Sequence, residues 1–252
     1  SYNNQATQVN LQSGLRASLP GGLTSTPGTI TTGIIKMESI LLKKKGDFIR
    51  MGVHTRENER MLSSVGTVFL HVTKNGQPMR FTQGIAEIKY PSNTYLGPAT
   101  SFIDTDTLPQ IFNWTRNPDT LLRNAEWSQG FYSIRTRDFG WINAANTIDT
   151  GNSLTTFQIS LPAHYTNKNT AAYLVYSDGL VVDVMRPNVN LRKFMSNSVG
   201  TGTIVKLLVL SKQAGSYFMA QSTATATGGI QNVAVEPRIT SLNLLLQALE
   251  NL

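Results

Sequence analysis

Aromatic side chains between residues 114 and 141 form the most distinctive group in the sequence that could carry out binding chemistry. All three tryptophans of the chain lie in this stretch: Trp114, Trp127 and Trp141. Exposed aromatic rings on a β surface stack on sugar rings or on bases, which makes the three tryptophans a candidate ligand platform. The alternative is that the rings fill a core where two modules meet. The strand-like segment 139–143, in which Gly140 allows close backbone approach, favours the core.

The histidines and carboxylates show no pattern typical of catalysis. His54, His71 and His164 lack metal-ligand spacing, and the chain contains no HExxH, GxSxG, GxGxxG or P-loop sequence. Asp104 and Asp106 alternate as calcium ligands do, but no glycine or closing glutamate follows at the EF-hand positions, which favours a solvated turn. The sequence therefore predicts no catalytic, cofactor-binding or metal-binding residue and no cofactor.

The composition is that of a folded protein rich in strand and turn residues. The 252 residues, of which 40% are hydrophobic and 15% charged, suffice for one large or two ordinary β domains. Cysteine is absent from the sequence, which excludes disulfides, thiolate metal sites and cysteine nucleophiles.

A net charge of +7 raises nucleic acid as a partner, but the distribution of the charges argues against it. The basic run at residues 43–45 precedes Gly46 and Asp47 and is typical of a solvated turn between strands. Elsewhere basic residues alternate with acidic ones, as in residues 54–60, and no basic stripe or aromatic–basic platform is present. We expect no nucleic-acid partner.

From residue 29 onward, short apolar or alternating runs are separated by turn residues, which predicts strands. Residues 48–54 alternate and are expected to form one of them. Asn75-Gly76, Asp178-Gly179 and the turn at 212–215 predict three hairpins. Strands that recur about every 8–12 residues indicate an antiparallel sandwich or barrel. The predicted fold class is all-β, with two antiparallel β-sandwich-like modules.

The last residues of the chain predict a short amphipathic helix. After Pro237, either Thr240 or Ser241 can cap a helix that reaches Leu252. Its leucines share one face: Leu242, Leu245, Leu246, Leu249 and Leu252. A helix this short is marginal alone, so this face must be buried. We expect it to pack on its own module, with a dimer contact as the alternative.

The predicted organisation has three parts. Residues 1–28 are polar and read as a lead-in or tether; residues 29–145 form an N-terminal β module with the aromatic connecting segment; residues 146–252 form a C-terminal β-sandwich with the terminal helix. The chain opens with Ser1 and not with Met, so we expect that a leader or a tag was removed. No apolar run approaches the roughly 18 residues of a membrane span, so any membrane connection would be a lipid upstream of Ser1.

The aromatic segment also carries a resemblance to a family. The order Trp114, Trp127, Phe131-Tyr132 and then Phe139-Gly140-Trp141-Ile142-Asn143 resembles poorly characterised exported lipoproteins of Gram-negative gut and gliding bacteria, in which a GWIN strand joins two β modules. Similar features follow downstream: Leu161-Pro162, Asn169-Thr170, residues 173–176 (YLVY), a Gly-Thr-Ile-Val strand, Tyr217-Phe218 and the Leu-rich helix. The similarity covers residues 100–252. The family usually continues with Cys and Asp where Ala144 and Ala145 stand here.

The resemblance implies an exported protein at the outer-membrane surface or in the periplasm, without an agreed activity. Together with the missing catalytic pattern, it favours a non-enzymatic binding, structural or adhesion protein. Its partner would be a glycan, a matrix protein or another envelope component. The alternative is a hydrolase that acts on polysaccharide with a carboxylate pair, although nothing selects two of the 15 acids. The sequence carries no signal for the oligomeric state.

Overall fold

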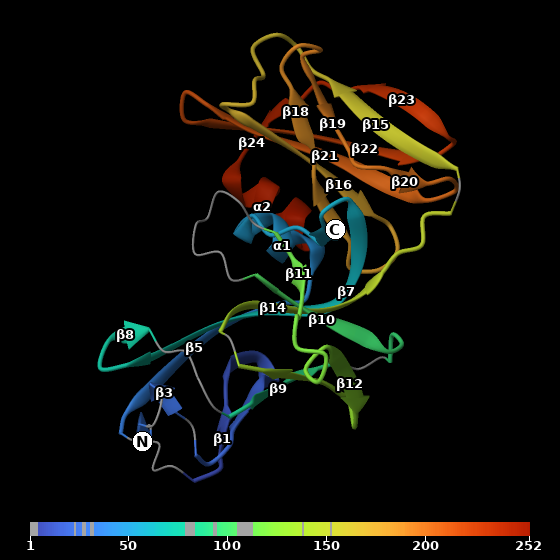
Figure 1. Cartoon of the computed structure of the whole chain (residues 1–252). Coiled ribbons are helices and arrows are strands. Elements are labelled where there is room, and N and C mark those ends of the chain that lie inside the picture. The colour runs from blue at the N-terminus through green and yellow to red at the C-terminus, as the bar shows by residue number, and fades with distance from the viewer. Residues whose placement is uncertain are drawn as a thin grey trace. The chain divides into compact units, whose positions relative to one another are not determined.

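The computed structural model describes residues 5–22, 24–26, 29–30, 33–78, 84–92, 95–104, 113–137, 139–151 and 153–252. It divides into two compact units (Figure 1). Unit 1 contains Ser1–Lys43 and Ser64–Asn146, and unit 2 contains Lys44–Ser63 and Thr147–Leu252. The predicted fold class, all-β with two antiparallel sandwich-like modules and a short C-terminal helix, is confirmed. None of the described helices has both the length and the apolar content that a membrane span requires.

Unit 1 is built on one curled antiparallel sheet with the strand order β1-β2-β9-β13-β12-β10-β14-β7-β5. These strands are β1 (Thr7–Asn10), β2 (Arg16–Leu19), β5 (Ile35–Leu42), β7 (Arg60–Lys74), β9 (Ala86–Pro91), β10 (Ala99–Asp104), β12 (Asn124–Ser128), β13 (Phe131–Thr136) and β14 (Gly140–Thr147). Shorter elements of unit 1 are η1 (Gln12–Gly14), the pair β3 (Thr24–Thr26) and β4 (Thr29–Ile30), β8 (Gln77–Pro78) and β11 (Thr115–Arg116). The short strand β6 (Arg56–Glu57) pairs with the start of β7 and belongs to unit 2. The first residues of β7, up to Ser63, belong to unit 2.

The core of unit 1 forms where the two halves of this sheet face each other. Alternate side chains of β9 and β13, such as Ile88 and Ile134, meet Val68 and Leu70 of β7 and Ile142 of β14. The period of two in each strand sends these residues to one face, so their burial follows from the sequence pattern. The segment 7–19, which lies in the stretch predicted as a lead-in, contributes β1 and β2 to this sheet. Leu15 and Ala17 are fully buried there.

Unit 2 consists of two sheets that enclose a second core. One sheet has the order β18-β19-β15-β20, with β23 beside β15, and the other has the order β17-β16-β21-β22-β24. The strands are β15 (Leu154–Ser160), β16 (Thr170–Tyr176), β17 (Val182–Val184), β18 (Arg186–Asn188), β19 (Lys193–Met195), β20 (Val199–Gly200), β21 (Ile204–Gln213), β22 (Ser216–Thr225), β23 (Gly229–Ala234) and β24 (Arg238–Thr240). The pairing of β23 with β15 is parallel and departs from the otherwise antiparallel pattern. Phe157, Leu174 and Leu207 from the two sheets meet in the core.

The three predicted hairpins are present. Asn75 and Gly76 connect β7 to β8 with φ of 52° and 77°, as a two-residue hairpin turn with left-handed residues requires. Ala214 and Gly215 connect β21 to β22 in the same way, with φ of 45° and 82°. The Asp178-Gly179 turn connects β16 to β17.

The strand predicted at residues 48–54 is wrong, because this segment forms helix α1 (Lys45–Met51). Phe48 and Ile49 are both buried on one side of the helix, whereas a strand would point them to opposite faces. The Asp47 carboxylate accepts a hydrogen bond from the Lys44 backbone N–H at 3.1 Å, and Gly52 ends the helix with a left-handed φ of 67°. A short apolar run does not by itself distinguish a strand from a helix.

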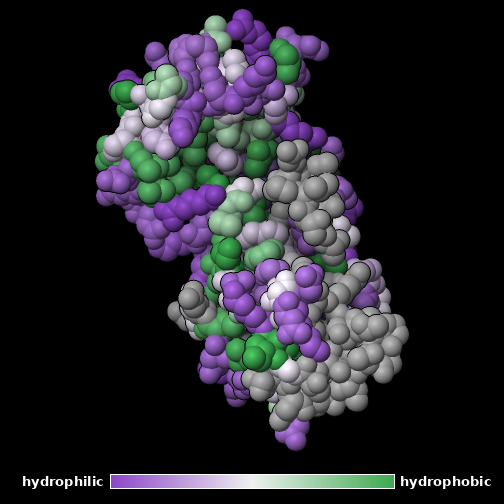
Figure 2. All heavy atoms as spheres, turned by 90° about the vertical axis from the view of Figure 1, so that its left-hand side faces the viewer, coloured by the Kyte–Doolittle hydropathy of each residue, from purple (hydrophilic) through white to green (hydrophobic). Residues whose placement is uncertain are grey.

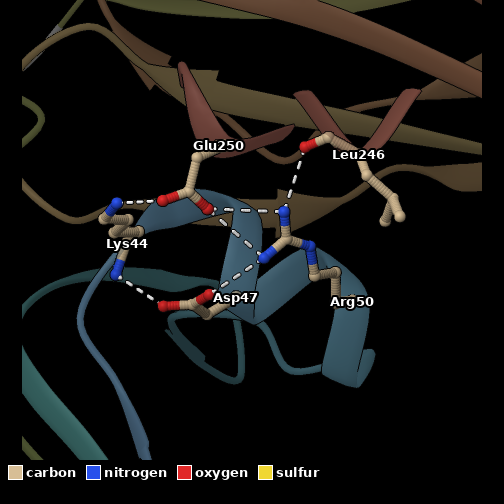
Figure 3. Close-up of polar contacts among 5 residues, drawn as sticks. All are labelled: Lys44, Asp47, Arg50, Leu246 and Glu250. Carbon is tan, nitrogen blue, oxygen red and sulfur yellow. Dashed lines mark hydrogen bonds and ion pairs between the residues drawn. The ribbon is translucent and has the colours of Figure 1, made fainter. Parts of the chain in front are cut away.

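Helix α2 (Leu242–Glu250) packs on α1 within unit 2 (Figure 3). Its N-cap is Ser241, whose hydroxyl accepts a hydrogen bond from the Leu244 N–H at 3.2 Å. Leu245 and Leu249 are buried, while Leu242 and Leu246 remain 45% and 38% exposed, so the leucine face is only partly covered.

Polar contacts from α1 fix the end of α2. The Arg50 guanidinium donates to the Leu246 carbonyl at 3.0 Å and lies 3.4 Å from the Glu250 carboxylate, which also pairs with Lys44 (Figure 3). These carboxylate contacts are exposed and stabilise weakly. The backbones of α1 and α2 also approach each other closely at Gly46, which leaves no room for a Cβ there.

We expect Gly46→Ala to destabilise unit 2 strongly. A Cβ at this position would lie 2.1 Å from the Leu249 carbonyl oxygen, so the helices must separate. Overpacking of this kind costs about 1–3 kcal/mol. Urea unfolding followed by circular dichroism measures the loss. Asn243→Ala, at an exposed position of α2, is the control and should change stability little. Equal stability of the two variants would contradict the close helix packing.

Candidate ligand-binding site

The three tryptophans of the candidate platform lie in different environments. Trp114 is fully buried next to β11, which pairs with β10. Its ring therefore has no face open to a ligand. Trp141, in β14, is half-buried, and its ring centroid lies 5.1 Å from that of Phe69. Trp127, in β12, is 38% exposed. The structure does not bring the three rings together as one surface.

Trp127 instead forms an exposed aromatic pair with Tyr95. The two ring centroids are 5.5 Å apart and the ring planes are tilted by 50°. Tyr95 is 55% exposed, and the adjacent Leu96 is 51% exposed. Aromatic pairs at this separation attract each other beyond their burial, which holds the rings in place. Among the described residues of unit 1, this Tyr95–Trp127 pair offers an exposed aromatic surface on which a ligand could stack.

Tyr132 anchors the loop that carries Tyr95. Its side chain is buried in β13, opposite Trp127 in the strand register. The Tyr132 hydroxyl accepts a hydrogen bond from the Leu96 N–H at 2.8 Å and donates one to the Gly97 carbonyl at 3.0 Å. Burial raises the pKa of Tyr132, so the hydroxyl stays protonated and can donate its hydrogen bond to Gly97.

A second side chain fixes the same loop. The Asn146 amide donates to the Leu96 carbonyl at 3.2 Å. Both backbone hydrogen-bonding groups of Leu96 are therefore bound by side chains of neighbouring strands. A loop held in this way loses little conformational entropy when a ligand binds. The sequence signal for this anchor is weak, because neither Tyr132 nor Asn146 is close to residue 96 in the chain.

The histidines and the paired aspartates do not converge. His54 is buried in unit 2, His71 lies 3.5 Å from Glu38 in unit 1, and the ring of His164 contacts that of Tyr165 at 4.2 Å. Asp104 is buried in β10, whereas Asp106 lies outside the described residues. In the described ranges, no three His, Asp or Glu side chains form a group able to hold a metal ion.

Unit 2 contains a buried charged network that the sequence analysis does not predict. Asp183, in β17, is 1% exposed; its Oδ1 lies 3.4 Å from the Arg56 guanidinium, and its Oδ2 accepts a hydrogen bond from the Asn197 amide at 2.8 Å. Arg186 donates to the Asn197 side-chain oxygen. Burial raises the pKa of the Asp183 carboxyl, although Arg56 and Asn197 act in the opposite direction.

The same network perturbs a tyrosine. Burial, together with the nearby Asp183 charge, raises the pKa of Tyr176 to about 12. Its hydroxyl is buried and has no hydrogen-bond partner among the described residues. Tyr176 and Phe157 belong to the same core cluster, so the network borders the core of unit 2. We assign it a structural role, because buried ion pairs join elements that are distant in sequence.

Asp183 should make unit 2 less stable as the pH rises. A carboxyl whose folded-state pKa exceeds its ordinary value of 3.8 binds its proton more tightly in the folded state. Its contribution to stability is therefore full below that value and declines as the pH rises through the folded-state pKa. We expect the free energy of unfolding of the native chain, minus that of Asp183→Asn, to fall as the pH rises above 3.8. Urea titrations at each pH measure it. If this difference in the free energy of unfolding grows with pH instead, the Arg56 charge lowers the pKa of Asp183 by more than burial raises it.

We expect Trp114→Ala to lower the free energy of unfolding by more than Trp127→Ala does, because Trp114 lies in the core and Trp127 at the surface. Removing the buried Trp114 ring leaves a cavity and should cost about 3–5 kcal/mol. Removing Trp127 should cost less, about 1–2 kcal/mol, because part of its ring is already in contact with water. Equilibrium unfolding in urea, followed by the fluorescence of the remaining tryptophans, compares the two. Equal losses would contradict the difference in burial.

Neither protein-family models nor curated proteins provide a match for this chain.

Proposed function

We propose that this chain is a non-enzymatic binding protein of the cell surface or periplasm, and that it binds a glycan on the Tyr95–Trp127 pair. The observation that carries the proposal is the exposure of both rings, 55% and 38%, on a loop and a strand that Tyr132 holds together. The apolar faces of sugar rings stack on exposed aromatic side chains, and a fixed pair of rings binds them at low entropic cost.

The surroundings of the pair fit a neutral or weakly polar ligand. The turn that follows Trp127 presents Ser128 and Gln129, both exposed, as hydrogen-bonding groups. Gln129 has a positive φ of 50°, a conformation that positions this turn between β12 and β13. Polar groups beside a stacking surface match the alternation of hydroxyls and C–H faces on a sugar.

The hydrolase alternative gains no support from the cavities. It requires two carboxylates facing each other across a cleft. Four pockets formed by described residues lack such a pair: one is lined by a single carboxylate, that of Glu236, and the other three by none. The proposed location rests on the resemblance of residues 100–252 to exported lipoproteins, and protease treatment of intact source cells, which should degrade a surface protein, tests it.

A glycan array on the full chain should identify a ligand, and calorimetry with the best glycan should measure its affinity. We expect the double variant Tyr95→Ala, Trp127→Ala to weaken binding about tenfold or more, because each ring contributes about 0.5–1.5 kcal/mol. Each variant is checked by circular dichroism for an intact fold.

Leu121→Ala is the matched control, since Leu121 is 77% exposed in unit 1 and does not belong to the pair. It should bind as the native chain does. A glycan that binds the double variant with undiminished affinity would exclude the pair as the site. An array with no bound glycan would exclude the glycan class.

A further inference from the structure

Unit 2 contains a pocket of about 400 Å³. It lies between the loop that follows β15, residues 161–167, and the segment 187–194 that runs from β18 to β19. Pockets that bind small molecules have volumes of about 300–1,000 Å³, so this one is large enough for a compact ligand. It is separate from the Tyr95–Trp127 pair, which belongs to unit 1.

The pocket walls are largely apolar. Leu161 and Pro162 line it from the first loop, and Pro187, Val189 and Phe194 from the second segment. Phe194 is 6% exposed, whereas Val189 is 70% exposed, so the lining runs from the core to open solvent. Exposed hydrophobic side chains also occur on β24 and α2 of this unit, and the space-filling view shows hydrophobic surface there among polar residues (Figure 2).

The charged residues that line the pocket are both basic. Arg192 donates from Nη2 to the Ala163 carbonyl at 3.4 Å, which joins the two loops across the pocket. The Lys193 ammonium is held by the side-chain oxygens of Gln158 and Asn232, at 3.0 and 2.6 Å. Within the described residues, no carboxylate comes within 4.0 Å of either cation. The positive charge at this pocket is therefore uncompensated.

Local hydrogen bonds hold Arg192 in place. The Leu191 N–H donates to the Asn188 side-chain oxygen at 3.0 Å, and the Arg192 N–H donates to the Val189 carbonyl at 3.2 Å. Arg192 itself has a left-handed φ of 52°, which glycine or asparagine would adopt at lower cost. An arginine at such a position keeps its guanidinium at the pocket at the expense of stability, as strained residues in binding sites do.

We propose that this pocket binds a small molecule with an apolar, ring-sized body and one carboxylate, and that the carboxylate pairs with Arg192. The apolar body lies against Leu161, Pro187 and Phe194. The guanidinium presents two parallel N–H donors to the carboxylate, a geometry that selects an acid over its amide. This site is independent of the glycan proposal, because its residues and its ligand are different.

The test compares two probes that differ only in charge, indole-3-acetate and indole-3-acetamide, in calorimetric titrations of the full chain. We expect the native chain to bind the acid about tenfold more tightly than the amide, as a charge-assisted hydrogen bond predicts. Arg192→Asn should abolish this preference, and asparagine tolerates the left-handed backbone, so the fold is kept. Arg192→Lys should retain part of the preference. Arg238→Gln, at an exposed cation elsewhere in unit 2, should bind both probes as the native chain does.

The native chain alone can overturn the proposal. Equal affinity for the acid and the amide would show a neutral apolar pocket, and no binding of either at millimolar concentration would exclude small ligands of this class. A preference for the acid that survives in Arg192→Asn would place the carboxylate on another cation. A circular dichroism spectrum of each sample checks that the protein in the titration is folded.

Discussion

The hydrogen bonds between Thr55 and Val182 are the constraint on which unit 2 depends. Thr55 is fully buried, and its N–H donates to the Val182 carbonyl at 2.7 Å, while its hydroxyl oxygen accepts from the Val182 N–H at 2.9 Å. These bonds fix residues 44–63 to a unit whose other residues begin 84 positions later, at Thr147. Met61 then enters the core, α1 reaches α2, and Arg56 reaches Asp183. Buried backbone groups without such partners would each cost about 1–3 kcal/mol.

Local features of the fold could be predicted from the sequence because their causes are local. Asn75-Gly76 forms its hairpin because both residues accept positive φ, and Ser241 caps α2 because its hydroxyl reaches an N–H three residues ahead. Helix α1 could not be predicted in this way. The alternation in residues 48–54 suits a strand, and the local signals for a helix, Asp47 in its first turn and Gly52 at its end, equally suit a turn. The packing that favours the helix, Leu249 against Gly46 and Arg50 on the Leu246 carbonyl, comes from residues about 200 positions away.

The candidate binding surfaces also depend on contacts between residues that are distant in the sequence. The sequence identified the tryptophans as a group and favoured their burial in a core, but it did not distinguish the environment of one ring from that of another. Trp127 points to the same face of β12 as the buried Ala125, yet it lies near the end of the strand, where the ring reaches solvent beside Tyr95. Trp114 is covered completely. The pocket at Arg192 had no sequence signal, because its two loops meet only when β15, β18 and β19 have paired.

The two candidate sites each lie on a loop that side chains hold in place, and the side chains differ between the two sites. A binding loop must be rigid enough to avoid a large entropy loss, although its backbone makes no sheet hydrogen bonds. At Tyr95 a strand side chain, Tyr132, bonds to the loop backbone on both sides of the Leu96–Gly97 peptide. At Arg192 the loop uses its own Asn188 and accepts a left-handed arginine. The first arrangement leaves an uncharged aromatic surface, and the second leaves a guanidinium whose hydrogen bond goes to the Ala163 carbonyl and not to a carboxylate. The uncharged aromatic pair therefore suits a neutral sugar, whereas the guanidinium of Arg192 suits an anion.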